Sequence, residues 1–373
     1  MDRPQMIRIF RYWQLFLLVS FIANTARAQA PAISNIGDPA PPLRLRAWLK
    51  GSPVDQFEKG KVYVLEFWAT WCKSCIASMP HLSAIANEYQ GKATVIAVDV
   101  AERATTPIGK IKTFVDSMGS RMDLRVAAED SNYMIAAWLN GTGEGTAIPK
   151  TIVVDSQGRL AWIGSPLQLG EVLPKIVNGG WDLKEALAAR NEERRLTALN
   201  DSLSFELAAC KGKPDSSLRM IAEIVRKEPK LEYASAIRVV TFNALLETDP
   251  HKACEYGRKL LSLPADRTQN AYFVYGAIED HLASPNFPAE IFQLGAEACQ
   301  WRIDNQPYPD IDGDAILYHR MAAFYWRTAN KARAIGAEEK AVETLKGQSG
   351  SSAHSRLLAY ESQLRRYKGD QAQ

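Results

Sequence analysis

The chain has 373 residues, of which 46% are hydrophobic and 23% are charged, an ordinary balance for a globular protein that excludes wholesale disorder. Its formal net charge is +3 at pH 7. The first 28 residues account for all of it, since they carry four arginines and one aspartate: Arg3, Arg8, Arg11, Arg27 and Asp2. The remainder is therefore close to neutral, and its charge gives no reason to expect binding to nucleic acid.

Residues 1–28 have the pattern of a secretory signal peptide. Arginines precede the apolar run "LFLLVSFIA", and Ala26 and Ala28 stand at the small-residue positions of an A-x-A cleavage site. The alternative is an uncleaved membrane anchor, for which the run is too short, because a spanning helix needs ~20 residues. We predict a mature chain that begins near Gln29 and is exported to the bacterial periplasm.

Residues 29–182 carry the pattern of an α/β domain. Apolar, β-branched runs at residues 61–69 and 93–100 predict buried strands, and apolar residues recur at helical spacing between them. Helices are predicted over residues 108–119 and 130–139. A hairpin formed by "KTIVVD" and "LAWIG" follows, and then a last helix, "GEVLPKIV". This order predicts a mixed sheet flanked by helices.

Residues 183–373 differ in composition, with charged helical segments, proline-containing breaks and no β pattern. One pair of segments resembles a tetratricopeptide hairpin, in which small residues lie where helices cross and aromatic residues fill the gaps. The residues that match are Tyr318, Met321, Ala322, Tyr325, Ala334 and Ala341. We predict an all-α, tetratricopeptide-like domain that holds a protein partner.

The stretch "VLEFWATWCKSCIASMP" contains two cysteines, Cys72 and Cys75, separated by two residues. A zinc site needs about four ligands, and no second pair of cysteines or histidines is spaced to supply them. A purely structural disulfide would close a very small loop and stabilise the fold little. As a redox pair, Cys72 would lie at a helix N-terminus, where the helix dipole and Lys73 favour the thiolate that attacks disulfides. Cys75, one turn further on, would resolve the mixed disulfide.

The motif "FWATWCKSC" closely resembles the active site of thioredoxin-fold proteins. With "GDPAPP", "AIPKTIVVDSQGRLAWIG" and "GGWD", the pattern resembles the TlpA/ResA-like family of exported thiol-disulfide oxidoreductases over roughly residues 35–182. The resemblance implies a thioredoxin-like fold and dithiol–disulfide exchange with protein thiols and disulfides. It also implies a reductase supplied by a membrane-embedded or soluble electron-donor protein, with no cofactor besides the redox-active disulfide and no metal.

The resemblance also implies roles for residues outside the cysteine pair. Glu66 matches a buried acid that takes a proton from Cys75; the alternative is a glutamate on an edge strand that faces solvent. Pro149 matches a cis-proline that presents the backbone of Ile148 to an extended substrate; the alternative is an ordinary trans proline. Trp71 matches the surface that contacts the substrate; the alternative is a core aromatic residue.

The sequence departs from the family pattern near the cysteines. Lys73 and Ser74 stand between them, without the common proline, and we expect these two residues to modulate the reduction potential. Ser78 occupies a position where many members carry glutamate, and Ala147 replaces a frequent glycine.

Two other functions remain open on the sequence. A peroxiredoxin-like peroxidase would need a proline and a threonine ahead of the attacking cysteine, and only Thr70 is present. A non-catalytic interaction platform in the cell envelope would not require the cysteine pair. The other cysteines lie in apolar helical contexts and are expected to be buried, inert thiols, with a Cys254–Cys299 bridge left open: Cys210, Cys254 and Cys299.

Overall fold

The computed structural model describes most of the chain beyond the predicted signal peptide, and residues 1–28 lie outside it. The described residues are 34–103, 105–129, 131–210, 212–263, 267–284, 287–305, 311–346, 348 and 351–369. Internal contacts divide the chain into two compact units, with the division between Ala188 and Ala189. No helix in the described ranges is both long and apolar enough to cross a membrane.

The first unit is built on one mixed sheet of six strands in the order β1-β4-β3-β2-β5-β6. The strands are β1 (Leu45–Lys50), β2 (Val62–Trp68), β3 (Ala93–Asp99), β4 (Arg125–Glu129), β5 (Lys150–Val154) and β6 (Leu160–Gly164). Strand β2 pairs in parallel with β3 and antiparallel with β5. Every residue of β2 is buried, as expected for a central strand covered on both faces. The predicted mixed sheet and the β5–β6 hairpin are confirmed.

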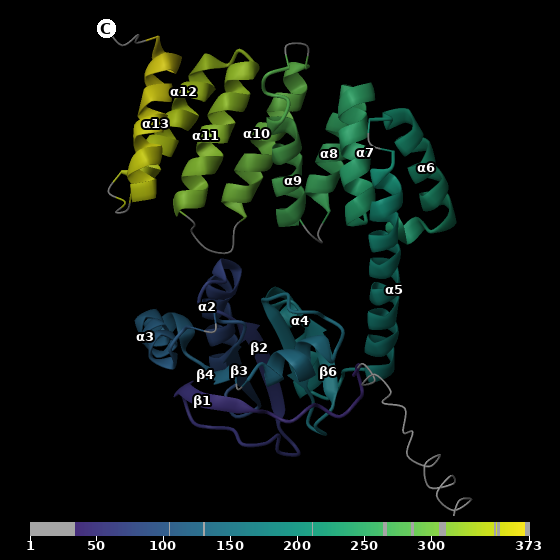
Figure 1. The fold of residues 1–373 in the computed structure, drawn as a ribbon, viewed down its shortest axis with the longest axis vertical. Helices are drawn as coiled ribbons and strands as arrows, with labels where there is room; N and C mark the ends of the chain where they lie inside the picture. Colours follow the sequence, from purple (N-terminus) through teal and green to yellow (C-terminus); the bar gives the residue numbers. More distant parts are fainter. Residues whose placement is uncertain are drawn as a thin grey trace, which may run out of the picture. The chain divides into compact units, whose positions relative to one another are not determined.

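Both faces of this sheet are covered (Figure 1). One face packs against three α-helices: α2 (Lys73–Glu88), α3 (Ile108–Met118) and α4 (Leu169–Val177). We call this packed layer the first core; it includes Val64 and Trp68 of β2, Cys75 and Met79 of α2, Val115 of α3 and Leu173 of α4. The opposite face packs against Trp138 and the start of α5, through Tyr63, Leu65 and Phe67 of β2. Strand alternation therefore decides which side chains of β2 face α2.

Two elements of the first unit differ from the sequence prediction. The segment predicted as a helix over residues 130–139 forms a π-helix, η2 (Ile135–Asn140); its first residue, Asp130, lies outside the described part. The wider turn ends at Gly141, whose backbone N–H donates to the Ala136 carbonyl. Strand β4 was not predicted, because "RVAAE" is short and rich in alanine. Pairing with β1 and β3 stabilises it as a strand.

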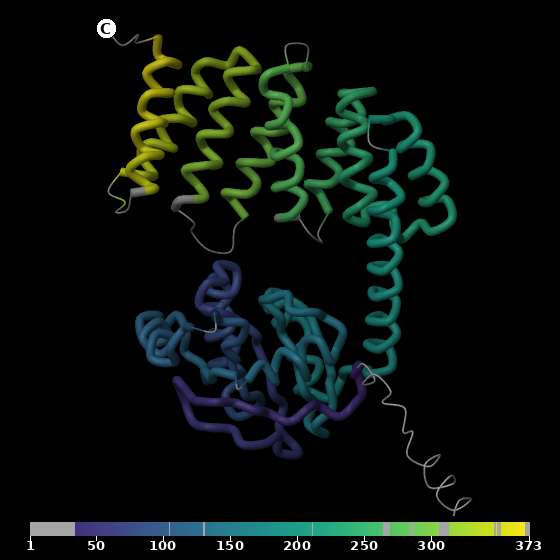
Figure 2. The backbone as a smooth tube through the Cα atoms, in the orientation of Figure 1, coloured from purple at the N-terminus to yellow at the C-terminus, as the bar shows by residue number. Residues whose placement is uncertain are grey.

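Beyond the sheet unit, the described residues form helices only, which confirms the predicted all-α region. The helices are α5 (Leu183–Ala208), α6 (Pro214–Lys227), α7 (Ser235–Thr248), α8 (Pro250–Ser262), α9 (Arg267–Glu279), α10 (Ala289–Asp304), α11 (Ile311–Arg327), α12 (Lys331–Leu345) and α13 (Ser351–Lys368). From α6 to α13 each helix packs against the next along the chain (Figures 1 and 2). The name tetratricopeptide-like remains a prediction.

Small residues allow close helix crossings in the second unit. Ala322, Ala334 and Ala341, which the sequence singles out, are fully buried in α11 and α12. Gly295 in α10 lies against the ring of Phe324, where an added Cβ would lie 2.9 Å from the ring atom Cε2. That distance is too short for any side chain to fit without displacing a buried aromatic ring.

We expect Gly295→Val to lower the free energy of unfolding of the second unit by about 1–3 kcal/mol, because the added carbons would overpack the α10–α11 contact. The matched control is Gly336→Val in α12, where an added Cβ would meet no atom within 4 Å. Its effect should stay within about 0.5 kcal/mol. Urea unfolding followed by far-ultraviolet circular dichroism measures both. Equal losses of stability in the two variants would contradict this packing argument.

Candidate active site

The cysteine pair lies where the central strand β2 meets α2. Strand β2 ends at Trp68 and α2 begins at Lys73, with Cys72 as the N-cap residue. Cys72 has an extended backbone (φ −83°, ψ 96°), and its Sγ accepts a hydrogen bond of 3.2 Å from the backbone N–H of Cys75. A sulfur in this position faces unpaired N–H groups and the positive end of the helix dipole. The site thus favours a thiolate at Cys72 when the pair is reduced.

Cys72 and Cys75 are joined by a disulfide, with their Cα atoms 5.3 Å apart. Cys72 is 5% exposed, whereas Cys75 is fully buried. Cys72 thus keeps a small exposed area at which an incoming thiol or disulfide can approach, whereas Cys75 has none. This asymmetry matches the division of labour between an attacking and a resolving cysteine.

The two residues between the cysteines are both exposed. The Ser74 hydroxyl lies 3.5 Å from the Cys72 sulfur, and Lys73 adds a positive charge in the first turn of α2. Ser78, one turn further along α2, is buried and donates its hydroxyl hydrogen bond to the Cys75 carbonyl at 2.8 Å. Ser78 thus holds the backbone of the buried cysteine and leaves no carboxylate at this position.

Glu66 is buried in the middle of the sheet. Strand alternation places it on the same face as Val64 and Trp68, in the layer that contains Cys75. Its side chain is completely buried, so the alternative of a solvent-facing glutamate on an edge strand is wrong. Thr151, its partner in the β2–β5 register, donates a hydrogen bond to Oε2.

Burial raises the pKa of the Glu66 carboxyl to about 8, although the Thr151 hydrogen bond and the charge of Lys150 lower it. The other carboxylate oxygen, Oε1, has no hydrogen-bond partner among the described residues. A carboxyl held in an apolar layer with one unsatisfied oxygen is ready to exchange a proton near neutral pH.

A second buried carboxyl, Asp99, lies on the same sheet face. It ends β3, directly opposite Trp68 in the β2–β3 register, and is 3% exposed. Burial raises its pKa to about 8, with the nearby carboxyls of Glu102 and Glu129 adding to the effect. The sequence analysis missed both Asp99 and Thr151. The sequence does hold a signal for Asp99, which is an acidic residue at the end of a predicted buried strand. Thr151 can be identified as the partner of Glu66 only from the register between β2 and β5.

The residues expected to contact the substrate lie in two loops. The Ile148–Pro149 peptide bond is cis, so the alternative of a trans proline is wrong, and Ile148 packs against the layer that contains both cysteines. Trp71 is 58% exposed, so it is not a core aromatic residue. Its indole Nε1 donates a hydrogen bond of 3.1 Å to the Ala101 carbonyl, which holds the ring in place beside Cys72.

The three remaining cysteines belong to the second unit and are free thiols; Cys210 is half-buried, so the expectation that all three are buried is wrong for it. Cys254 and Cys299 are buried, and burial raises the pKa of both, that of Cys254 to about 11. Neither is a thiolate at neutral pH, so neither is suited to attack a disulfide.

Comparisons with known proteins agree with this geometry. Residues 36–163 match the AhpC/TSA family. Protein FixW of Rhizobium leguminosarum is 30% identical over 151 residues, which are 39% of this chain and 68% of FixW. Thiol-disulfide oxidoreductase ResA of Bacillus anthracis is 32% identical over 103 residues, which are 27% of this chain and 53% of ResA.

A solved thiol-disulfide isomerase from Corynebacterium glutamicum is 21% identical, with 38% of this chain and 97% of that chain covered and a TM-score of 0.33. The chain thus spans about two thirds of FixW and about half of ResA. Residues 36–163, which the family model matches, lie within the sheet unit and include the cysteine pair. The chain therefore belongs to the AhpC/TSA family of thioredoxin-like proteins, with thiol-disulfide oxidoreductases among its relatives.

Proposed function

We propose that the chain is an exported reductase of protein disulfides that acts by dithiol–disulfide exchange at Cys72 and Cys75. One observation carries the proposal: a cysteine with a small exposed area caps a helix N-terminus, its bonded partner is fully buried, and a carboxyl of raised pKa lies in the same packed layer. Export rests on the sequence pattern of residues 1–28. The direction of electron flow rests on the resemblance to ResA-like proteins.

The reaction begins with the reduced pair. The Cys72 thiolate attacks one sulfur of the substrate disulfide, whose S–S bond breaks and releases a substrate thiolate. Cys75 then attacks the Cys72 sulfur of the mixed disulfide and releases the second substrate thiolate, which takes up a proton. The Cys72–Cys75 disulfide forms, and two electrons pass from the chain to the substrate. A dithiol protein must then reduce the pair again, and this is the donor that the proposal requires.

Glu66 acts in the second step. Cys75 is fully buried, so water cannot readily remove its proton before it attacks. The Glu66 carboxyl shares its layer with Cys75, and its raised pKa makes it a base of suitable strength near neutral pH. We assign Glu66 as the proton acceptor for Cys75, with Thr151 as a positioning residue that holds the carboxyl.

The substrate docks beside the pair in an extended conformation. The Ile148 backbone, held by the cis peptide to Pro149, supplies hydrogen bonds in the manner of an added strand. Trp71 supplies an exposed aromatic surface next to Cys72. The second unit consists of packed helices, and we propose that it holds a protein partner. The paired cysteines and the ResA relatives support disulfide exchange over a peroxidase or a passive platform.

Removal of the attacking cysteine should abolish activity. Cys72→Ser is expected to reduce disulfide exchange with a model protein disulfide to the uncatalysed rate, because no sulfur remains to attack. Cys75→Ser should still attack once and then accumulate the mixed disulfide, which mass spectrometry detects. Cys254→Ser is the control and should retain full activity. Full exchange by Cys72→Ser would overturn the assignment.

Loss of the buried acid should slow resolution in a pH-dependent way. Since the Glu66 carboxyl has a pKa of about 8, its basic form grows as pH rises, and the resolving step should speed up through that range. Glu66→Gln should slow this step by roughly 100-fold above pH 8 and remove the inflection. Thr151→Val removes a hydrogen bond that lowers this pKa, so its inflection should move to higher pH. Rapid-quench measurement of mixed-disulfide decay checks both, and an unchanged pH profile in Glu66→Gln would exclude the role.

The reduction potential of the mature protein should indicate a reductant. We expect a value nearer that of thioredoxin, roughly −270 mV, than that of the strong oxidant DsbA, roughly −120 mV. Thiol trapping across a dithiothreitol series measures it. A value near the oxidising end would leave the exchange chemistry intact and reverse the proposed direction.

A further inference from the structure

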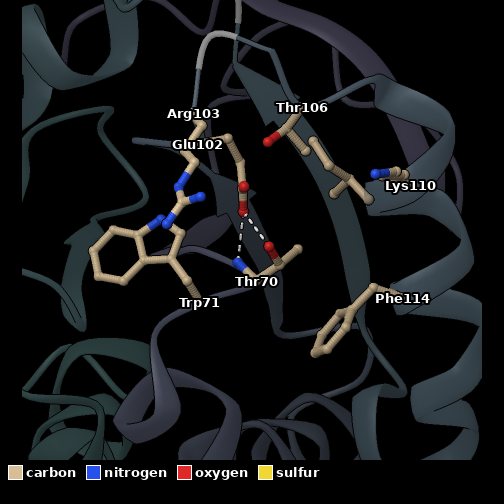
Figure 3. Close-up of a pocket in the computed structure, with 8 residues that line it drawn as sticks. Thr70, Trp71, Glu102, Arg103, Thr106, Lys110 and Phe114 are labelled. Carbon is tan, nitrogen blue, oxygen red and sulfur yellow. Dashed lines mark hydrogen bonds between the residues drawn. The ribbon is translucent and has the colours of Figure 1, made fainter.

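A cavity of about 350 Å³ opens on the side of Trp71, in the first unit. Figure 3 shows its lining, which comes from the loop after β2, the loop after β3 and helix α3. This volume is at the lower end of those that hold small ligands or single side chains. Nothing in the proposed exchange chemistry uses it.

Trp71 joins this cavity to the reactive sulfur. The residue immediately precedes Cys72 and lines the cavity. The indole N–H of Trp71 donates a hydrogen bond of 3.1 Å to the Ala101 carbonyl. This bond fixes the position of the ring although the ring is largely exposed. A polypeptide whose disulfide meets Cys72 would therefore pass over the mouth of the cavity with a residue close to that disulfide.

The charges in the cavity favour an anion. Glu102 lines it, but its carboxylate turns onto Thr70 and accepts hydrogen bonds of 2.6 Å from that residue's backbone N–H and hydroxyl (Figure 3). Arg103 and Lys110 also line it, and both residues are exposed. In the part of the chain that the structure describes, neither of these two side chains forms an ion pair. The lining thus carries two cations against one carboxylate, a net charge of +1, and that carboxylate is already hydrogen-bonded to Thr70.

The remaining residues of the lining suit a side chain with a short aliphatic segment and a charged terminal group. Phe114 and Ile111 of α3 give the wall an apolar patch, and Thr106 adds a hydroxyl to the lining. A carboxylate side chain would find an apolar surface for its methylene groups and a cation, Arg103 or Lys110, for its oxygens. A cationic or long apolar side chain would leave the two positive charges unpaired.

We propose that this cavity is a subsite for an acidic side chain, Asp or Glu, that flanks the target disulfide in a protein substrate. The inference rests on the proposed function, because it names the class of substrate that Cys72 attacks. The subsite would set the preference among disulfides and take no part in the bond changes. Arg103 and Lys110 are its specificity-determining residues.

Paired peptides test the subsite. Each peptide carries one internal disulfide. The two members of a pair differ only at a single position near one cysteine, which holds Glu in one peptide and Gln in the other. This position changes from one pair to the next. The second-order rate of oxidation of the reduced protein is measured by acid quench and mass spectrometry. We expect wild type to prefer Glu over Gln by roughly two- to fivefold at one or more positions. Arg103→Glu and Lys110→Glu should abolish or invert this ratio, and added salt should reduce it.

Lys59→Glu is the matched control for net charge. Lys59 is exposed and precedes β2, at the end of the strand away from Trp71. A strand of seven residues rises about 3.3 Å per residue, so this charge lies roughly 20 Å or more from the cavity. That separation exceeds the Debye length of about 10 Å at 0.1 M salt, and Lys59→Glu should keep the wild-type ratio.

Because each result is a ratio within one variant, a general loss of activity cancels. A ratio near one at every position in wild type, or an unchanged ratio in both Arg103→Glu and Lys110→Glu, would overturn the subsite. The subsite would also be overturned if Lys110→Glu slowed only the reaction with glutathione disulfide and kept the wild-type peptide ratio. That result would assign the cavity to small anions. If neither peptide of any pair oxidised the reduced protein, the proposed function itself would fail.

Discussion

The packing of α2 against the central strand β2 is the constraint on which the site depends. Because β2 is buried on both faces and ends at Trp68, the chain must turn into α2 within a few residues. That turn makes Cys72 the helix N-cap and buries Cys75 one turn later. The attacking and resolving sulfurs therefore differ in exposure and in electrostatic environment, although they lie only three residues apart in the chain.

The same packed layer controls protons. An ordinary surface carboxyl would be ionised at neutral pH, but Glu66 and Asp99 both lose their hydration in the first unit, and burial raises the pKa of each to about 8. The hydrogen bond from Thr151 limits this effect at Glu66. Stability and chemistry are thus linked, since the apolar residues that hold the sheet to its helices also adjust the acid that serves the buried cysteine.

Around this rigid centre, loops carry the surfaces that distinguish one substrate from another. The cis peptide before Pro149 and the exposed Trp71 lie in loops at strand ends, and the cavity beside Trp71 is lined by two loops and α3. Charged residues in these loops can be substituted without disturbing the packing of the sheet. The second unit has its own cores, built where small residues let helices approach closely.

Local patterns in the sequence determined a large part of this description. The strand–C-x-x-C–helix order, the β5–β6 hairpin and the all-helical second half follow from periodicity and from residue types that need only near neighbours. The pairing of Glu66 with Thr151, the position of Asp99 opposite Trp68 and the strand identity of β4 could not be predicted in the same way. They depend on the register between strands that are distant in the chain, and on burial that only the packed layers create. The sequence by itself thus determined which residues can exchange electrons. The tertiary structure decided which carboxyls are buried near them and which cations line the neighbouring cavity, because burial and cavity lining depend on contacts between segments far apart in the chain.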